Sequence, residues 1–258
     1  MKKYLKELYK RKDLLIYLVI SGLKAQHRNT YLGYLWWILD PLLMGIVYYF
    51  LRVIIFGMKG DNIGAFLIIG LVAFKWFASV LSGSSRSISA KSGIITQVYM
   101  PKAIFPISTV FTQMANFIFS FVVIAGFLVF HRIVPTAYIL WLPVIMVVNV
   151  LFLTAIGLIL AYCAMMIRDI ENVITHVNRI MRYGSPIIWE ADRLPERYSF
   201  IMEYNPLAFL VISYRNILMY GEPPLLQALF ITGVVSMAVI MYMFYFYDRN
   251  EHKLIRAI

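Results

Sequence analysis

Long apolar runs separated by short polar segments dominate this chain. The runs cover about 35–57, 63–82, 103–130, 137–167 and 225–247. A helix over the first run is about 35 Å long, which is enough to cross a hydrocarbon core about 30 Å thick. The run at 137–167 exceeds the thickness of a bilayer, so we expect it to tilt or to project into the cytoplasm. The pattern therefore predicts a set of membrane-spanning helices.

Residues 172–189 are a weaker candidate for a further span. Their apolar residues recur at the spacing of one helix face, while the opposite side carries His176, Arg179, Arg182 and Tyr183. A span that faces a wet interior and a helix that lies in the membrane interface both fit this pattern. With this segment included, we predict an all-α integral membrane protein with six transmembrane helices.

The remaining segments predict helices at the membrane surface. Residues 1–30 hold basic side chains around an apolar stretch that is too short to span. They resemble a signal peptide, but Leu23 stands where cleavage needs a small residue, so we favour an uncleaved cytoplasmic interface helix. Residues 190–222 alternate charged and apolar side chains and predict short external amphipathic helices. Residues 248–258 are expected to form a cytoplasmic tail.

Composition and charge narrow the class of protein. With 61% hydrophobic residues and a mean hydropathy of +0.75, a soluble domain of 258 residues could not bury its apolar surface. We interpret the net charge of +11 as positive-inside bias and attraction to anionic lipid, and not as nucleic-acid binding. Trp36 and Trp37 fit an aromatic belt, and the basic residues before them predict that both termini are cytoplasmic. The single cysteine, Cys163, excludes an intrachain disulfide.

The sequence holds no recognisable catalytic motif. It lacks the GxxxxGK[ST] pattern of a P-loop, and it lacks GxSxG, HExxH and paired-glutamate metal motifs. We therefore predict no catalytic residue, no metal site and no cofactor on this chain. A membrane-embedded enzyme of lipid or glycan metabolism is the less favoured alternative.

Charged side chains at membrane depth are the candidate functional residues. Asp40, Lys75, Arg179 and Arg182 would each cost about 2.5–3.5 kcal/mol at the bilayer centre. We expect them either to line a transport path or to reach the headgroups. Arg179 and Arg182 share a predicted helix face with His176, and that face would suit an anionic substrate such as a lipid-linked phosphate.

Aromatic pairs lie in the first two spans, at Tyr48 and Tyr49 and at Trp76 and Phe77. Such rings usually pack against other helices or lipid, but they also stack on the apolar faces of sugars. We therefore include these four residues among the candidates for a channel that carries a glycan.

Five short motifs occur in order along the chain. They are Tyr31 to Pro41 (YLGYLWWILDP), Val98 to Pro106 (VYMPKAIFP), Arg168 with Asp169, Ser185 with Pro186, and Asn205 with Pro206 followed by Arg215 and Gly221. Together they resemble the permease subunit of ABC-2-type polysaccharide exporters, most closely the Wzm-type O-antigen exporter permeases. The resemblance covers nearly the whole chain, 1–258, as one transmembrane domain. Asp40, Lys102 and Trp189 depart from the residues usual in that family.

The resemblance implies that separate subunits form the membrane path and hydrolyse ATP. Two permease copies would pair with two cytoplasmic ABC ATPase subunits, which bind ATP and Mg, in a bacterial inner membrane. The paired permeases would form a tunnel that carries an undecaprenyl-diphosphate-linked polysaccharide, O antigen, to the periplasm. Capsule, teichoic acid and hydrophobic drugs are alternative cargoes.

The resemblance also implies roles for individual residues. Coupling to the ATPase would fall to Leu32, Gly33, Arg86, Lys91, Pro101, Lys102, Arg168, Asp169 and Glu171. The external mouth of the tunnel would be formed by Pro186, Trp189, Asn205, Pro206 and Arg215.

Overall fold

A computed structural model describes residues 2–26, 28, 30–57, 60, 62–95, 100–167, 169–198, 202 and 204–256, without the side chains of 2, 3, 5, 94, 193 and 252–256. Every regular element in these ranges is helical. The α-helices are α1 (Lys2–Lys10), α2 (Lys12–Gln26), α3 (Trp36–Tyr49), α4 (Ile63–Arg86), α5 (Ser92–Ile95), α6 (Ile104–Phe130), α7 (Leu142–Met166), α8 (Ile170–Gly184), α10 (Pro206–Arg215) and α11 (Leu226–Arg256). The 3-10 turns are η1 (Gly33–Leu35), η3 (Ser89–Lys91), η4 (Ala137–Trp141), η5 (Ala191–Arg193) and η6 (Glu196–Tyr198), and the π-helical segments are η2 (Phe50–Ile55) and η7 (Asn216–Tyr220).

Five helical stretches in the described part of the chain are long and apolar enough to cross a membrane. They are Gly33–Ile55, Ile63–Arg86, Ile104–Phe130, Ala137–Met166 and Leu226–Glu251, so the five strong apolar runs are confirmed as long apolar helices. The weaker run at 172–189 corresponds to α8. This helix has 15 residues and is about 22 Å long, less than a bilayer core. A sixth crossing at this position stays a prediction.

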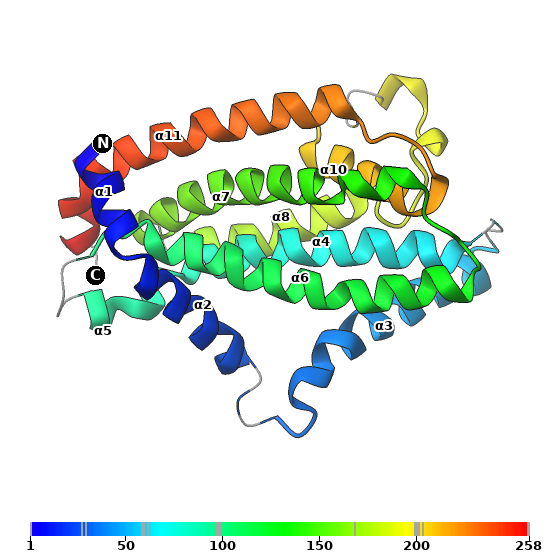
Figure 1. The fold of residues 1–258 in the computed structure, drawn as a ribbon, viewed down its shortest axis with the longest axis horizontal. Coiled ribbons are helices and arrows are strands. Elements are labelled where there is room, and N and C mark those ends of the chain that lie inside the picture. The colour runs from blue at the N-terminus through cyan, green and yellow to red at the C-terminus, as the bar shows by residue number, and fades with distance from the viewer. Residues whose placement is uncertain are drawn as a thin grey trace.

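Helix α4 is the centre of the bundle. It packs against α3, α6, α7, α8 and α10, and its side chains are buried along most of its length. A helix that is apolar on all sides is expected to be surrounded by others. The remaining long helices bury one face and expose the other, as α11 does where it lies along α7 (Figure 1).

Different helices lie at the two ends of the bundle. Both chain termini, α1 and α5 lie at one end, which we call the terminal end; α10 lies toward the other, the distal end (Figure 1). A second hydrophobic cluster closes the terminal end around Tyr4 and Tyr247. The Tyr4 hydroxyl accepts from the backbone N–H of Ala103 (3.2 Å), and the Tyr247 hydroxyl donates to the carbonyl of Leu158 (2.9 Å).

The structure adds detail to three of the predicted segments. The helix predicted within 1–30 is two helices, α1 and α2. Helix α11 continues to Arg256, so most of the predicted tail at 248–258 is helical, since no glycine or proline interrupts it. The helix α10 is not amphipathic and surface-lying as predicted for 190–222, because residues on several of its sides are buried against α4, α7 and α11.

The start of α10 explains one of the sequence motifs. Asn205 is the N-cap, and its side-chain oxygen accepts from the backbone N–H groups of Leu207 (3.1 Å) and Ala208 (3.4 Å). Pro206 occupies the first helical position, where the missing N–H has no cost. The Asn205 amide also donates to the hydroxyl of Ser185 at 2.8 Å. The Asn-Pro pair therefore begins α10 and joins it to the segment after α8.

Candidate functional site

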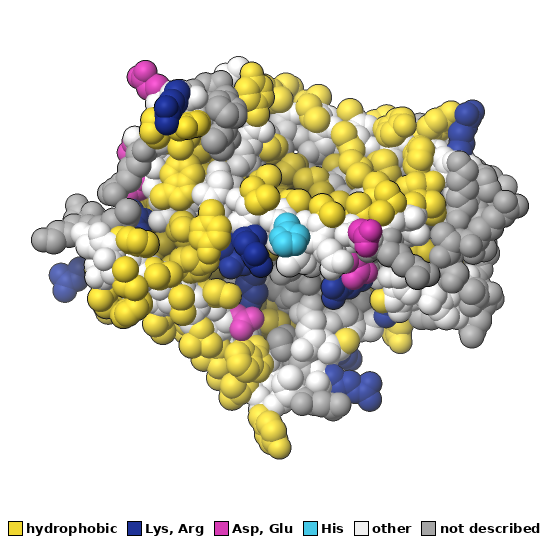
Figure 2. Space-filling view, turned by 180° about the vertical axis from the view of Figure 1, so that it is seen from behind, with side chains coloured by type: hydrophobic (Ala, Val, Ile, Leu, Met, Phe, Trp, Pro, Cys, Tyr) yellow, Lys and Arg dark blue, Asp and Glu magenta, His cyan; other side chains and the backbone are white. Residues whose placement is uncertain are grey.

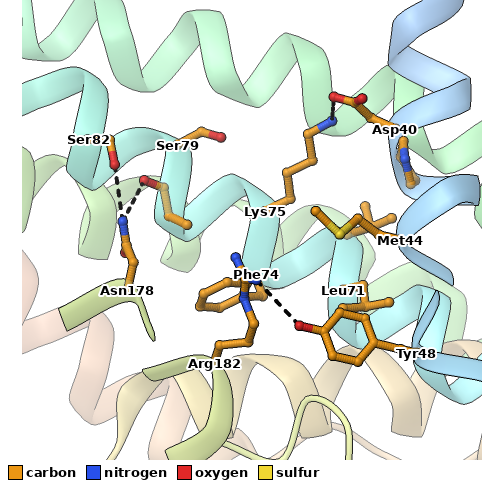
Figure 3. A pocket seen from close by; sticks show the side chains of 13 residues that line it. Asp40, Met44, Tyr48, Leu71, Phe74, Lys75, Ser79, Ser82, Asn178 and Arg182 are labelled. Atoms are coloured by element: carbon orange, nitrogen blue, oxygen red, sulfur yellow. Dashed lines mark hydrogen bonds and ion pairs between the residues drawn. The ribbon is translucent and has the colours of Figure 1, made fainter. Parts of the chain in front are cut away.

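A charged cavity of about 390 Å³ lies between α3, α4 and α8 (Figure 3). Its lining residues are Asp40, Pro41, Met44, Tyr48, Leu71, Val72, Phe74, Lys75, Ala78, Ser79, Ser82, Asn178 and Arg182. Figure 2 shows the other side of the molecule from Figure 1, where Lys, Arg, acidic and His side chains gather between apolar areas. The cavity unites four of the residues predicted from sequence, on three separate helices.

Asp40 and Lys75 form an ion pair across the cavity wall. The Lys75 ammonium lies 3.0 Å from an Asp40 carboxylate oxygen, and the two side chains are 39% and 50% exposed. Asp40 belongs to α3 and Lys75 lies in the middle of α4, so the pair joins two of the long apolar helices (Figure 3). Pairing lets both charges lie within an apolar segment at a lower cost than either charge alone.

Arg182 supplies a positive charge to the opposite wall. Its guanidinium lies 5.1 Å from the centre of the Phe74 ring and donates to the Tyr48 hydroxyl at 3.4 Å. Within the described ranges no carboxylate forms an ion pair with Arg182, and its buried Nε atom has no hydrogen-bond acceptor. The cavity therefore has a net positive charge, because Asp40 and Lys75 neutralise each other.

Amide and hydroxyl groups complete the polar part of the lining. The Asn178 amide donates to the Ser82 hydroxyl at 3.1 Å and to the Ala78 carbonyl at 3.4 Å, which holds α8 against α4. A cation, an amide and several hydroxyls suit an anionic or hydroxyl-rich ligand. Among the described residues there is no group of three or more His, Cys, Asp or Glu side chains that could hold a metal ion.

The predicted aromatic candidates divide between cavity and core. Tyr48 lines the cavity, whereas Tyr49, on a neighbouring face of α3, lines a different hollow. Trp76 and Phe77 are only 2% and 5% exposed and pack against other rings within the bundle. They do not lie on an open surface of this chain, and the proposal that they line a channel stays a prediction.

Of the predicted group of His176, Arg179 and Arg182, only Arg182 lines the cavity. His176 and Arg179 are exposed and do not line the cavity. Arg182 instead shares a face with Asn178, four residues earlier, which is the spacing of neighbours on a helix. The same spacing could have drawn attention to Ser79 and Ser82, which sequence reasoning missed although they lie four and seven residues after Lys75.

The residues predicted to couple to an ATPase lie near the terminal end or in the turn before α3. Arg86, at the end of α4, forms an ion pair of 2.8 Å with Glu171 in the first turn of α8. Lys91 and Asp169 are exposed, and Arg168 lies outside the described residues. Asp169 is at the N-cap position of α8, but its side chain makes no capping hydrogen bond. The Arg86–Glu171 pair thus connects two segments that the sequence predicted separately.

Of the other coupling candidates, Leu32 is exposed, Gly33 is partly buried, and two are buried. Leu32 is exposed, and Gly33 has a positive φ of 48°, which turns the chain into α3. Pro101 and Lys102 are buried, and Lys102, 1% exposed, forms an ion pair with Glu251 of α11 at 3.3 Å. Lys102 therefore forms an internal ion pair, and its role in coupling to the ATPase stays a prediction.

Arg215 holds the segment after α8 against α4. Its guanidinium donates to the carbonyls of Phe66 (3.1 Å), Ile187 (2.7 Å) and Pro186, and it lies over the Phe66 ring. Burial lowers the pKa of Arg215 to about 9, so the group stays charged at neutral pH.

The other residues predicted at the mouth belong to the same region. The Trp189 indole donates to the Tyr183 carbonyl at 2.8 Å. Arg52, which sequence reasoning did not select, is 4% exposed and forms an ion pair with Glu190. The contacts of Arg215, Trp189 and Asn205 are therefore internal ones that fix the chain between α8 and α10.

Comparison with known proteins finds one transporter family and three similar permeases. The family model described as ABC-2 type transporter matches residues 13–219. An O-antigen export system permease protein RfbA of Klebsiella pneumoniae is 31% identical over 230 residues, which covers 88% of this chain and 89% of the relative. A second protein of that name from the same species is 33% identical over 226 residues, 86% and 87% of the two chains. One from Myxococcus xanthus is 27% identical over 240 residues, 92% of each.

Proposed function

This chain belongs to the ABC-2 type transporter family, and from that premise we propose that it is the permease subunit of a polysaccharide exporter. Its cargo is O antigen linked to undecaprenyl diphosphate, which it moves from the cytoplasm to the periplasm across the inner membrane. The names of the three relatives, which are O-antigen export permeases, support this cargo.

The charged cavity is the observation that carries the proposal. Lys75 and Arg182 lie among long apolar helices, where an unpaired charge costs about 2.5–3.5 kcal/mol. Charges in such a place face protein or water and mark a substrate path. The hydroxyls, the amide and the net positive charge of the lining suit both sugar hydroxyls and a diphosphate. We therefore place part of the path along the α3, α4 and α8 side of the chain.

The energy for export comes from a separate subunit. The sequence has no P-loop, so two copies of a cytoplasmic ABC ATPase bind ATP and Mg beneath a permease homodimer. The terminal end faces the cytoplasm in this arrangement, which follows the positive-inside bias of the basic residues in α1 and α2. The ion pair between Arg86 and Glu171 links the end of α4 to the start of α8, so a displacement of α4 would also move α8.

Transfer of a lipid-linked glycan into vesicles tests the proposal. The permease is purified with its ATPase and reconstituted, and ATP-dependent transfer is compared for Arg182→Gln and for Arg179→Gln as a matched control. We expect Arg182→Gln to slow transfer about tenfold or more, because hydrogen bonds to a charged group contribute about 1.5–3 kcal/mol. Arg179 is exposed outside the cavity, so its variant should keep the parent rate. Equal rates for both variants, or transfer without the ATPase, would contradict the proposal.

A further inference from the structure

Three neighbouring hollows lie along α3 and α6, and the third of them is also bounded by α4. The first, about 600 Å³, is lined by residues of α2, η1, α3 and α6, and it shares Ile38 and Val122 with the second, of about 430 Å³. The second shares Phe127 and Phe130 with the third, of about 540 Å³. We call this feature the α3–α6 furrow.

The furrow runs the full thickness of a membrane. Its lining begins at Tyr34, before α3, and continues to Val53 in η2, a helical length of about 29 Å. This matches the roughly 30 Å of a bilayer hydrocarbon core. One acyl chain of a phospholipid reaches across only one leaflet, or about half of that distance. A single hydrocarbon chain that fills the whole furrow must therefore be longer than a phospholipid acyl chain.

The lining is apolar along the middle and polar at the ends. Rings and aliphatic side chains form the walls, with Trp37 stacked on Phe119 at a centroid distance of 4.3 Å. Lys24 lines the end near α2, and Arg28 follows it four residues later in the chain. Asn62 and His131 line the distal end. A chain with a phosphate at the Lys24 end would match this distribution of charge.

Helix α3 separates the furrow from the charged cavity. Asp40, Met44 and Tyr48 point to the cavity, four residues apart on one face. Ile38, Leu42 and Tyr49 lie on the neighbouring face and line the furrow. A single helix thus borders a polar cavity on one side, between Asp40 and Tyr48, and a longer apolar furrow on the other.

We propose that the α3–α6 furrow holds the polyisoprenoid chain of the lipid-linked substrate while its polar part passes through the charged cavity on the other face of α3. This inference rests on the proposed function. The length of the furrow favours a polyisoprenoid over a phospholipid, and Lys24 at its end neutralises the phosphate next to the chain. The hydrocarbon then stays in contact with the membrane throughout, and it never has to enter the polar path.

Photolabelling with a lipid that carries no glycan tests the occupant. The permease–ATPase complex is placed in lipid nanodiscs with undecaprenyl phosphate that carries a diazirine on its chain, and labelled peptides are identified by mass spectrometry. We expect label on α3 and α6 around Ile38, Val122 and Phe130. A phospholipid with a diazirine on its acyl chain, at equal concentration, is the comparison probe.

A substitution that fills the furrow should reduce labelling by the polyisoprenoid probe. A Cβ added at Gly126 has nothing within 4 Å, so Gly126→Leu occupies the middle hollow without displacing the backbone, and leucine favours the helix. Labelling by the polyisoprenoid probe should fall about tenfold, which corresponds to about 1.4 kcal/mol. Val129→Leu is the control, because Val129 is exposed on α6 and lines none of the three hollows; its labelling should equal that of the parent.

The outcomes separate this inference from the proposed function. Equal labelling by the phospholipid probe, unchanged labelling of Gly126→Leu, or cross-links between the furrows of two copies would each overturn the inference. Because the probe has no glycan, labelling does not require transport. Furrow labelling without glycan transfer into vesicles would defeat only the proposed function, and transfer without furrow labelling would defeat only the inference.

Discussion

The buried ion pair between Lys102 and Glu251 gives a sharp test of how the terminal end is held together. Lys102 precedes α6, and Glu251 lies near the end of α11, so the pair joins segments far apart in the sequence. The Lys102 side chain is 1% exposed and that of Glu251 is 12% exposed, at a separation of 3.3 Å. Apolar residues around Ile104 and Tyr247 enclose this region.

Removing the carboxylate should be more damaging than removing the ammonium. Glu251→Gln keeps the shape of the side chain but removes a charged partner of the buried Lys102 ammonium, and the loss of one member of a buried ion pair costs up to about 3–5 kcal/mol. For a chain of this size that corresponds to a fall in melting temperature of about 6–20 °C. Lys102→Met leaves a carboxylate that reaches solvent more readily, so its effect should be smaller. The double variant carries neither charge and should recover most of the loss.

Thermal unfolding of the purified, detergent-solubilised protein measures these differences. The four proteins, parent, two single variants and double variant, are melted under the same conditions and followed by tryptophan fluorescence. We expect the melting temperature to fall in the order parent, double variant, Lys102→Met and Glu251→Gln. If Glu251→Gln melts within about 2 °C of the parent, or the double variant melts no higher than Glu251→Gln, the pair does not stabilise this end.

Two further substitutions test the distal end. Gly70→Ala should lower the melting temperature, because a Cβ at this position would lie 2.7 Å from the Ile187 carbonyl oxygen and would displace the Arg215 guanidinium. Gly126→Ala, which has open space around it, should leave the melting temperature unchanged. Equal melting temperatures of the two variants would show that Arg215 does not need the close contact with Gly70. Asn205→Ala should cost about 1 kcal/mol through the lost N-cap of α10. Asn205→Asp keeps the side-chain oxygen that caps α10, so it should recover part of the lost stability in the same assay. If it does not, the destabilisation by Asn205→Ala comes from the lost hydrogen bond with Ser185.

The sequence by itself determined the class of protein, five long apolar helices and the family. These follow from local properties, because apolar runs of bilayer length have few alternatives in a 258-residue chain. The charges at Asp40, Lys75 and Arg182 were identifiable as candidates for the same reason, since each interrupts or borders an apolar pattern. The motif of Asn205 and Pro206 was visible too, although its role in capping α10 was not.

Only the tertiary structure decided which of these residues meet. Asp40 and Lys75 are far apart in the sequence, and their ion pair depends on how α3 packs on α4. The same packing buries Trp76 and Phe77, turns Arg182 toward Phe74, and opens the furrow beside α6. A helical pattern indicates which residues share a face, but not which neighbour that face will touch. That choice depends on side-chain shape at the crossings of helices, which no single segment contains.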